Sequence, residues 1–186
     1  MRVVAGTAGG IPLSVLDGVV RPTTDKARGA IFSSLGDAVP DARVLDLFAG
    51  SGALAIEALS RGASSAVLVE QNPRAVDIIR KNLKKCRLEA SVQTMDVHRF
   101  LEAYAHPGSF DLVFADPPYR KSASDTDHVS RLLGSPKLAD CLSDIGTFVL
   151  EAFTSDPLPD LAGTPWQLLR SRAYGESTIH YLTVAR

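Results

Sequence analysis

The feature that most constrains the fold is an alternation of short apolar runs with segments of helical pattern between residues 43 and 151. Runs of this length that end at turn or polar residues are typical of buried strands, whereas apolar residues three and four apart indicate helices. The apolar runs lie at 44–48, 66–70, 91–95, 110–115 and 147–151. Strands that alternate with helices form βαβ units and a mostly parallel sheet, so we expect an α/β fold.

The remaining segments complete this prediction. Helices are expected at 24–35, 52–60 and 73–86, and the last begins with Asn72-Pro73, an N-cap followed by proline at the first helical position. Two β-like stretches at 167–173 and 178–184 flank a Tyr-Gly turn and predict a C-terminal antiparallel hairpin. Short, glycine-punctuated pieces near the start predict a small β-hairpin extension. We therefore divide the chain into an extension, residues 1–22, and a main domain, residues 23–186.

Composition sets broad limits on the function. The 186 residues suffice for one domain with a substantial core, and the net charge of −1 argues neither for nor against nucleic acid. The two cysteines lack a CxxC spacing and the four histidines lack metal-ligand spacing, so we expect reduced thiols and no metal. We find no apolar run of membrane-spanning length and no signal-peptide pattern. A cytoplasmic monomer without a membrane partner is the expectation.

Acidic residues follow the expected strands. They are Asp46, Glu70, Asp96, Asp116 and Glu151. The carboxyl ends of parallel strands meet at one edge of a sheet, and ligands of open α/β sheets bind at that edge. The five carboxylates are therefore expected to line one ligand site.

A glycine-rich turn at residues 46–52, Asp-Leu-Phe-Ala-Gly-Ser-Gly, joins the first of these strands to a helix and allows a ligand close to the backbone. The spacing also fits a dinucleotide fingerprint, so NAD is a rival ligand. Asp46 disfavours a pyrophosphate and suits a cationic amino-acid moiety, Glu70 suits a ribose, and Asp96 suits an adenine amine. S-adenosylmethionine combines these groups. The residues expected to bind it are Asp46, Phe48, Gly50, Gly52, Glu70, Gln71, Asp96, Val97 and Asp116.

The tetrad Asp116-Pro117-Pro118-Tyr119 follows the strand expected at 110–115. Its prolines stiffen the backbone and leave carbonyl acceptors without a ladder role. With a carboxylate and an aromatic face beside them, these groups suit a planar ring that carries an NH₂ group. A Pro-Pro turn that merely ends a strand is the alternative. We take the four residues as the candidate catalytic set and the polar segment 120–128 as a candidate closing loop.

These motifs resemble class I methyltransferases that act on exocyclic amines. The segment Arg21-Pro-Thr-Thr-Asp-Lys-Ala-Arg28, together with the tetrad, resembles the RsmD family over nearly the whole chain. The resemblance implies a Rossmann-like, S-adenosylmethionine-dependent methyltransferase fold with a seven-stranded sheet. It also implies methylation of guanine N2 in 16S rRNA, at the position usually numbered 966, within an assembled or assembling 30S subunit.

One departure from the family concerns RNA contacts. Members tend to carry basic residues in the N-terminal hairpin, whereas residues 9–13 here read Gly-Gly-Ile-Pro-Leu. Contacts are therefore expected elsewhere, at Arg2, Arg21, Lys26, Arg28, Lys84 and Lys85. The basic stretch 74–87 is equally explained as the solvated face of a helix.

Other functions remain open from the sequence. A DNA or protein amine methyltransferase, acting on adenine N6 or glutamine, would share the cofactor site and the tetrad. A small-molecule methyltransferase would not need the segment 21–28. A non-catalytic RNA-binding assembly factor would not need acids at the strand ends.

Overall fold

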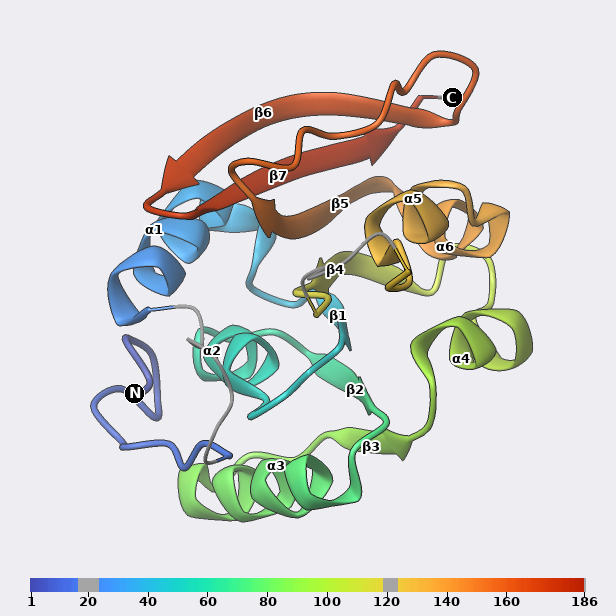
Figure 1. The fold of residues 1–186 in the computed structure, drawn as a ribbon. Helices are drawn as coiled ribbons and strands as arrows, with labels where there is room; N and C mark the ends of the chain where they lie inside the picture. Colours follow the sequence, from blue (N-terminus) through green and yellow to red (C-terminus); the bar gives the residue numbers. More distant parts are fainter. Residues whose placement is uncertain (17–23, 119–123, 186) are drawn as a thin grey trace.

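A computed structural model describes residues 1–16, 24–118 and 124–185, and it contains one seven-stranded sheet with helices on both faces (Figure 1). The strands are β1 (Arg43–Leu47), β2 (Ser65–Glu70), β3 (Ser91–Thr94), β4 (Phe110–Ala115), β5 (Leu142–Phe153), β6 (Trp166–Tyr174) and β7 (Ser177–Val184). The helices are α1 (Asp25–Leu35), α2 (Ala53–Ser60), α3 (Pro73–Cys86), α4 (Val97–Tyr104), α5 (His128–Leu133) and α6 (Pro136–Cys141), with a 3₁₀ turn η1 (Gly36–Ala38).

The strand order is β3-β2-β1-β4-β5-β7-β6. Strands β1 to β5 pair in parallel, and β7 pairs antiparallel with both β5 and β6. The chain builds outward from β1 to β3 and then returns to place β4 on the other side of β1. The switch in strand order therefore lies between β1 and β4, which is where ligands bind in sheets of this kind. The predicted mostly parallel sheet and C-terminal hairpin are confirmed.

Alternation along the strands divides the core between the two faces of the sheet. Val44 packs in the cluster that contains α1, α2 and α3, whereas its neighbour Leu45 packs in the cluster that contains α4, α5 and α6. Leu112 and Val113 of β4 divide in the same way. Because both faces are covered, these strands are apolar at nearly every position rather than at alternate ones.

The sequence did not lead us to expect three of the helices, and β5 is longer than expected. α4, α5 and α6 have six to eight residues, which is too short for a clear helical period. Each is nevertheless capped by a side chain at the preceding residue: Asp96, Asp127 and Ser135. β5 begins at Leu142 instead of the expected position 147, and its pairing with β4 is irregular near that start.

The first residues form a hairpin-like turn but no regular strand. A single antiparallel bridge joins Arg2 and Pro12, and Val3 exchanges backbone hydrogen bonds with Gly10 and Ile11. The buried side chains of Val3 and Leu13 pack in the core cluster of α1, α2 and α3. The N-terminal segment thus packs on the main body, and the boundary at residue 22 lies outside the described residues and stays a prediction.

No helix in the described ranges is long and apolar enough to cross a membrane. Within the same ranges, no group of three or more potential ligands is arranged to hold a metal ion. Cys86 and Cys141 are both buried free thiols.

Candidate active site

Three carboxyl groups come together at the carboxyl edge of the sheet, from the neighbouring strands β1, β4 and β5. Asp46 is the penultimate residue of β1 and Asp116 directly follows β4, whereas Glu151 lies two residues before the end of β5. Asp46 and Glu151 are buried, and Asp116 is half-buried. The strand order therefore confirms that these acids share one edge next to the switch between β1 and β4.

The charges of these groups affect one another. Burial raises the pKa of Asp46 to about 8, although the backbone N–H of Ala55 donates to this carboxyl group over 3.1 Å. Burial also raises the pKa of Asp116 well above its usual value, and the neighbouring charges of Glu151 and Asp46 raise it further. Such a site favours a ligand that carries positive charge, because that charge stabilises the ionised carboxylates.

The glycine turn after β1 adopts the conformation that its residues require. Gly50 and Gly52 have φ angles of +54° and +77°, and Phe48 has a φ of +58°. A Cβ added at Gly52 would lie 3.0 Å from a methyl group of Leu68, so this position is needed for packing in the core. A Cβ at Gly50 would meet nothing closer than 3.9 Å, so it would project into open space. Gly50 therefore leaves room for a ligand to approach the turn.

The acids expected at the ribose and the adenine make hydrogen bonds within the protein. Glu70 accepts hydrogen bonds from the backbone N–H groups of Gly50, over 2.9 Å, and of Asn72, over 2.8 Å. Asp96 caps α4 by accepting from the N–H of Arg99 over 3.0 Å. A carboxylate can accept several hydrogen bonds, so these contacts leave capacity for ligand hydroxyl or amine groups.

The two neighbouring residues expected at the cofactor differ in exposure. Gln71 is exposed beside Glu70, whereas Val97 is buried as the first residue of α4. A buried Val97 side chain leaves only its backbone for a ligand. Together, the groups at this edge fit S-adenosylmethionine. They comprise hydrogen-bond acceptors for a ribose and an amine, an open glycine turn, and carboxyl groups that favour a cation.

An aromatic cluster beside this site was not anticipated. The rings of His98 and His128 are stacked with centroids 5.4 Å apart, and Nε2 of His98 lies 3.2 Å from Nδ1 of His128. Phe48 contacts His128 edge-on at 5.0 Å between ring centroids. Burial lowers the pKa of both histidines, which favours the neutral rings that one N–H···N hydrogen bond requires. The two histidines are thirty residues apart and belong to α4 and α5, so no local pattern predicts their contact.

A cavity of about 320 Å³ opens next to the tetrad. Its walls come from Pro117 and Pro118, from residues 127–130 at the start of α5, and from residues 151–159 at the end of β5 and beyond. Pro117 is buried and Pro118 exposed. Tyr119 and residues 120–123 of the candidate closing loop lie outside the described residues, so their roles stay predictions, while His128 at the end of that segment begins α5. The cavity thus adjoins the described part of the tetrad.

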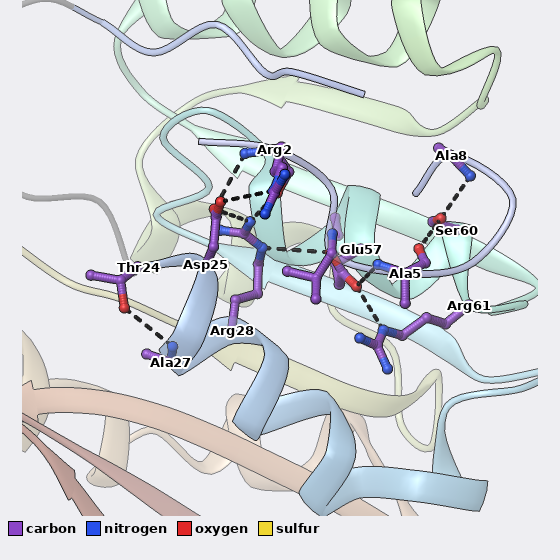
Figure 2. A network of polar contacts seen from close by, with 12 residues as sticks. Arg2, Ala5, Ala8, Thr24, Asp25, Ala27, Arg28, Glu57, Ser60 and Arg61 are labelled. Atoms are coloured by element: carbon purple, nitrogen blue, oxygen red, sulfur yellow. Dashed lines mark hydrogen bonds and ion pairs between the residues drawn. The ribbon is translucent and has the colours of Figure 1, made fainter. Parts of the chain in front are cut away.

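The structure corrects one candidate RNA contact. Arg28 was expected at an RNA-binding surface, but its side chain is completely buried. Its guanidinium lies 3.6 Å from the carboxylate of Glu57 and 2.8 Å from that of Asp25, and it donates to the backbone carbonyl of Arg2 (Figure 2). Arg28 therefore holds the protein together and is not available to phosphates.

Glu57 extends this network to the N-terminal segment. Its carboxylate accepts from the backbone N–H of Val4 over 2.7 Å and of Ala5 over 3.0 Å, and from Arg61 over 2.7 Å (Figure 2). Ser60 donates to the carbonyl of Ala5 over 2.6 Å. The network fastens the first residues of the chain to α1 and α2, and the burial of Arg28 follows from this packing.

The other candidate RNA contacts are placed differently. Arg2, Lys26, Lys84 and Lys85 are exposed, and Arg21 lies outside the described residues. Two of the exposed residues also contact the protein: Arg2 lies 3.7 Å from Asp25, and Nζ of Lys85 donates to the carbonyl of Pro12 over 2.6 Å. Their contacts with RNA stay predictions.

Comparison with known proteins identifies the family of the chain. A family model described as conserved hypothetical protein 95 matches residues 1–183. The chain belongs to this family. YlbH of Bacillus subtilis (strain 168) is 36% identical over 179 residues, which cover 94% of each protein. Ribosomal RNA small subunit methyltransferase D of Escherichia coli (strain K12) is 33% identical over 178 residues, which cover 95% of this chain and 86% of that protein.

A solved structure has the same architecture. YhhF from Escherichia coli superposes with a TM-score of 0.81 at 30% identity, over 99% of this chain and 97% of that one. Together with the relatives, this likeness confirms the RsmD resemblance and the Rossmann-like methyltransferase fold. S-adenosylmethionine, the cofactor predicted from the residues, is the methyl donor of this fold.

Proposed function

We propose that this protein transfers a methyl group from S-adenosylmethionine to the exocyclic N2 of a guanine in 16S rRNA, at the equivalent of position 966. The substrate is the small subunit, assembled or in assembly, in the cytoplasm. The observation that carries the proposal is the position of Asp116: it follows β4 at the switch in strand order, beside Asp46 and next to the cavity at Pro117 and Pro118. The name of the Escherichia coli relative supports the choice of small-subunit rRNA.

The chemistry follows from the groups at this edge. The cofactor supplies an electrophilic methyl group on a sulfonium centre. The exocyclic amine of guanine is a weak nucleophile because its lone pair is delocalised into the ring. Asp116 and the carbonyl of Pro117 accept hydrogen bonds from the N–H groups of this amine. These hydrogen bonds localise the lone pair and direct it toward the methyl group, and such positioning supplies most of the rate enhancement. The raised pKa of Asp116 also suits it to receive the proton that the amine then loses.

The remaining parts bind and orient the two ligands. Asp46, Glu70 and Asp96 hold the cofactor through their carboxylates, and Gly50 leaves it space at the turn. Tyr119 is proposed to stack on the base, a contact of about 1–3 kcal/mol. A base in a folded subunit must first leave its stack to reach the cavity.

The proposal is tested with a labelled methyl donor and small subunits that lack the modification. We expect label in 16S rRNA, recovered as N2-methylguanine at a single position. Label in adenine, in DNA or in a protein glutamine instead would replace the proposal by one of the alternative amine methyltransferases. Failure to label any of these substrates, with tight binding of the subunit, would favour a non-catalytic assembly factor.

A further inference from the structure

The cavity beside the tetrad has a buried carboxylate in its wall, and Asp116 directly precedes the wall residue Pro117. Glu151 of β5 lines this cavity and is only 6% exposed. Two other acids line it, but both are placed differently. The carboxylate oxygens of Asp127 accept from the N–H and the hydroxyl of Ser130, both over 2.9 Å, so Asp127 caps α5. Asp156 is exposed on the segment after β5.

The register of the sheet places Glu151 beside Asp116. β4 and β5 are parallel, and their last paired residues are Ala115 and Leu150. Asp116 directly follows Ala115, and Glu151 directly follows Leu150. Since neighbouring strands are about 4.8 Å apart, Asp116 and Glu151 lie side by side. The charge of Glu151 is also one of the causes that raise the pKa of Asp116, as expected for neighbouring carboxyl groups. Glu151, in the cavity wall, and Asp116, directly before the wall residue Pro117, are therefore neighbouring carboxyl groups at adjacent strands.

Two adjacent acceptors match guanine better than adenine. The Watson–Crick edge of guanine carries two adjacent donors, the N1–H and the N2 amine. The edge of adenine carries one amine next to N1, which is an acceptor. A carboxylate that accepts the N1–H of guanine would face the lone pair of N1 in adenine, and a site built to receive a donor strongly rejects a base that lacks it. A flipped base is read at this edge.

We propose that Glu151 is a specificity-determining residue, which accepts a hydrogen bond from N1–H of the target guanine while Asp116 accepts from the N2 amine. The inference rests on the proposed function and adds to it how guanine is selected. Asp116 and the Pro117 carbonyl would accept hydrogen bonds from an adenine amine nearly as well. Glu151, in contrast, would find no donor at N1 of adenine.

The test compares guanosine with 2-aminopurine riboside at the target position of reconstituted, unmodified small subunits. 2-Aminopurine keeps the amine that is methylated but has an acceptor at N1. We expect the wild-type protein to prefer guanosine by at least about 10²-fold in kcat/KM, since a polar site that loses its partner discriminates strongly. In Glu151→Gln the amide can donate to N1 of 2-aminopurine, and the preference should fall at least tenfold.

The ratio is measured within one preparation of each variant, so a lower fraction of folded enzyme cancels. Asp156→Asn is the matched control, because it neutralises an exposed acid on the same cavity and should leave the ratio unchanged. Equal loss on both bases in Glu151→Gln would overturn the inference and leave the proposed function intact. Absence of methyl transfer to guanosine by the wild type would overturn both.

Discussion

The two ends of β1 and β4 carry the same type of residue in opposite electrostatic settings. At the amino end, Asp111 of β4 accepts two hydrogen bonds of 2.9 Å from the guanidinium of Arg43 on β1, and this contact holds the pKa of Asp111 well below its usual value. At the carboxyl end, burial raises the pKa values of Asp46 and Asp116. In the described ranges, no arginine or lysine forms an ion pair with either.

The buried network at Arg28 resembles the amino end of the strands, because its carboxylate is also paired with arginine. Glu57 is as deeply buried as any acid of the site, yet Arg28 and Arg61 lie beside its carboxylate. In this network, the buried carboxylate of Glu57 is therefore paired with two arginines. Among the described residues, Asp46 and Asp116 have no such arginine, and a cationic ligand would supply the compensating charge.

The largest expected effect comes from Asp116→Ala at the ligand edge. Loss of the acceptor for the amine should lower kcat by about 10²–10⁴-fold, while the cofactor still binds. Turnover is measured by labelled methyl transfer and binding by calorimetry. Asp111→Ala, on the same strand at the other end, should keep full turnover at temperatures where it is folded. Full activity of Asp116→Ala would remove the distinction between the two edges.

A large effect on stability is expected from Glu57→Gln. The substitution leaves Arg28 with a weaker partner in a fully buried place, and breaking a buried pair of this kind costs about 3–5 kcal/mol. Urea unfolding measures the loss. Arg80→Ala is the control, because the ion pair of Arg80 with Asp77 is exposed and contributes little. Equal stability of the two variants would contradict the structural role of the network.

Cofactor binding should depend on pH through Asp46. Its pKa of about 8 means that the carboxyl group is largely protonated at pH 7, and a cationic ligand favours the ionised form. Binding should therefore release a proton, and affinity should rise with pH up to about 8 and then level off, by at most about tenfold per pH unit. Calorimetry in buffers of different ionisation enthalpy detects the proton. Asp46→Asn should abolish its release; release that persists in this variant would assign the proton to another group.

The smallest effect is expected at the amino end. Arg43→Ala should cost about 1 kcal/mol at neutral pH, since the pair is partly exposed and solvent screens it. The pKa of Asp111 is lower in the folded protein than its usual 3.8, so this contribution is present above that pH and is lost as pH falls below it. Unfolding measured between pH 3 and pH 7 should show a smaller acid-dependent loss in Arg43→Ala. An identical pH profile would contradict the pairing.

Much of the fold and half of the site could be predicted from local patterns. The apolar runs identified the five strands of the parallel part, and Asn72-Pro73 located the start of α3. Short helices such as α5 and α6 escaped because six residues contain less than two turns. The acids followed the strands, so their common edge could be inferred without knowledge of any contact.

The sequence by itself determined which residues end the strands and that the ligand edge is acidic, because strand period and chain direction are local properties. Only the tertiary structure decided which charges meet. Arg28 looked like a basic surface residue until packing of α1 against α2 buried it beside Glu57, and Glu151 looked like one more strand-end acid until the register placed it beside Asp116. Such pairs depend on contacts between residues far apart in the chain, where a small shift in packing decides between an ion pair, a ligand site and an exposed charge.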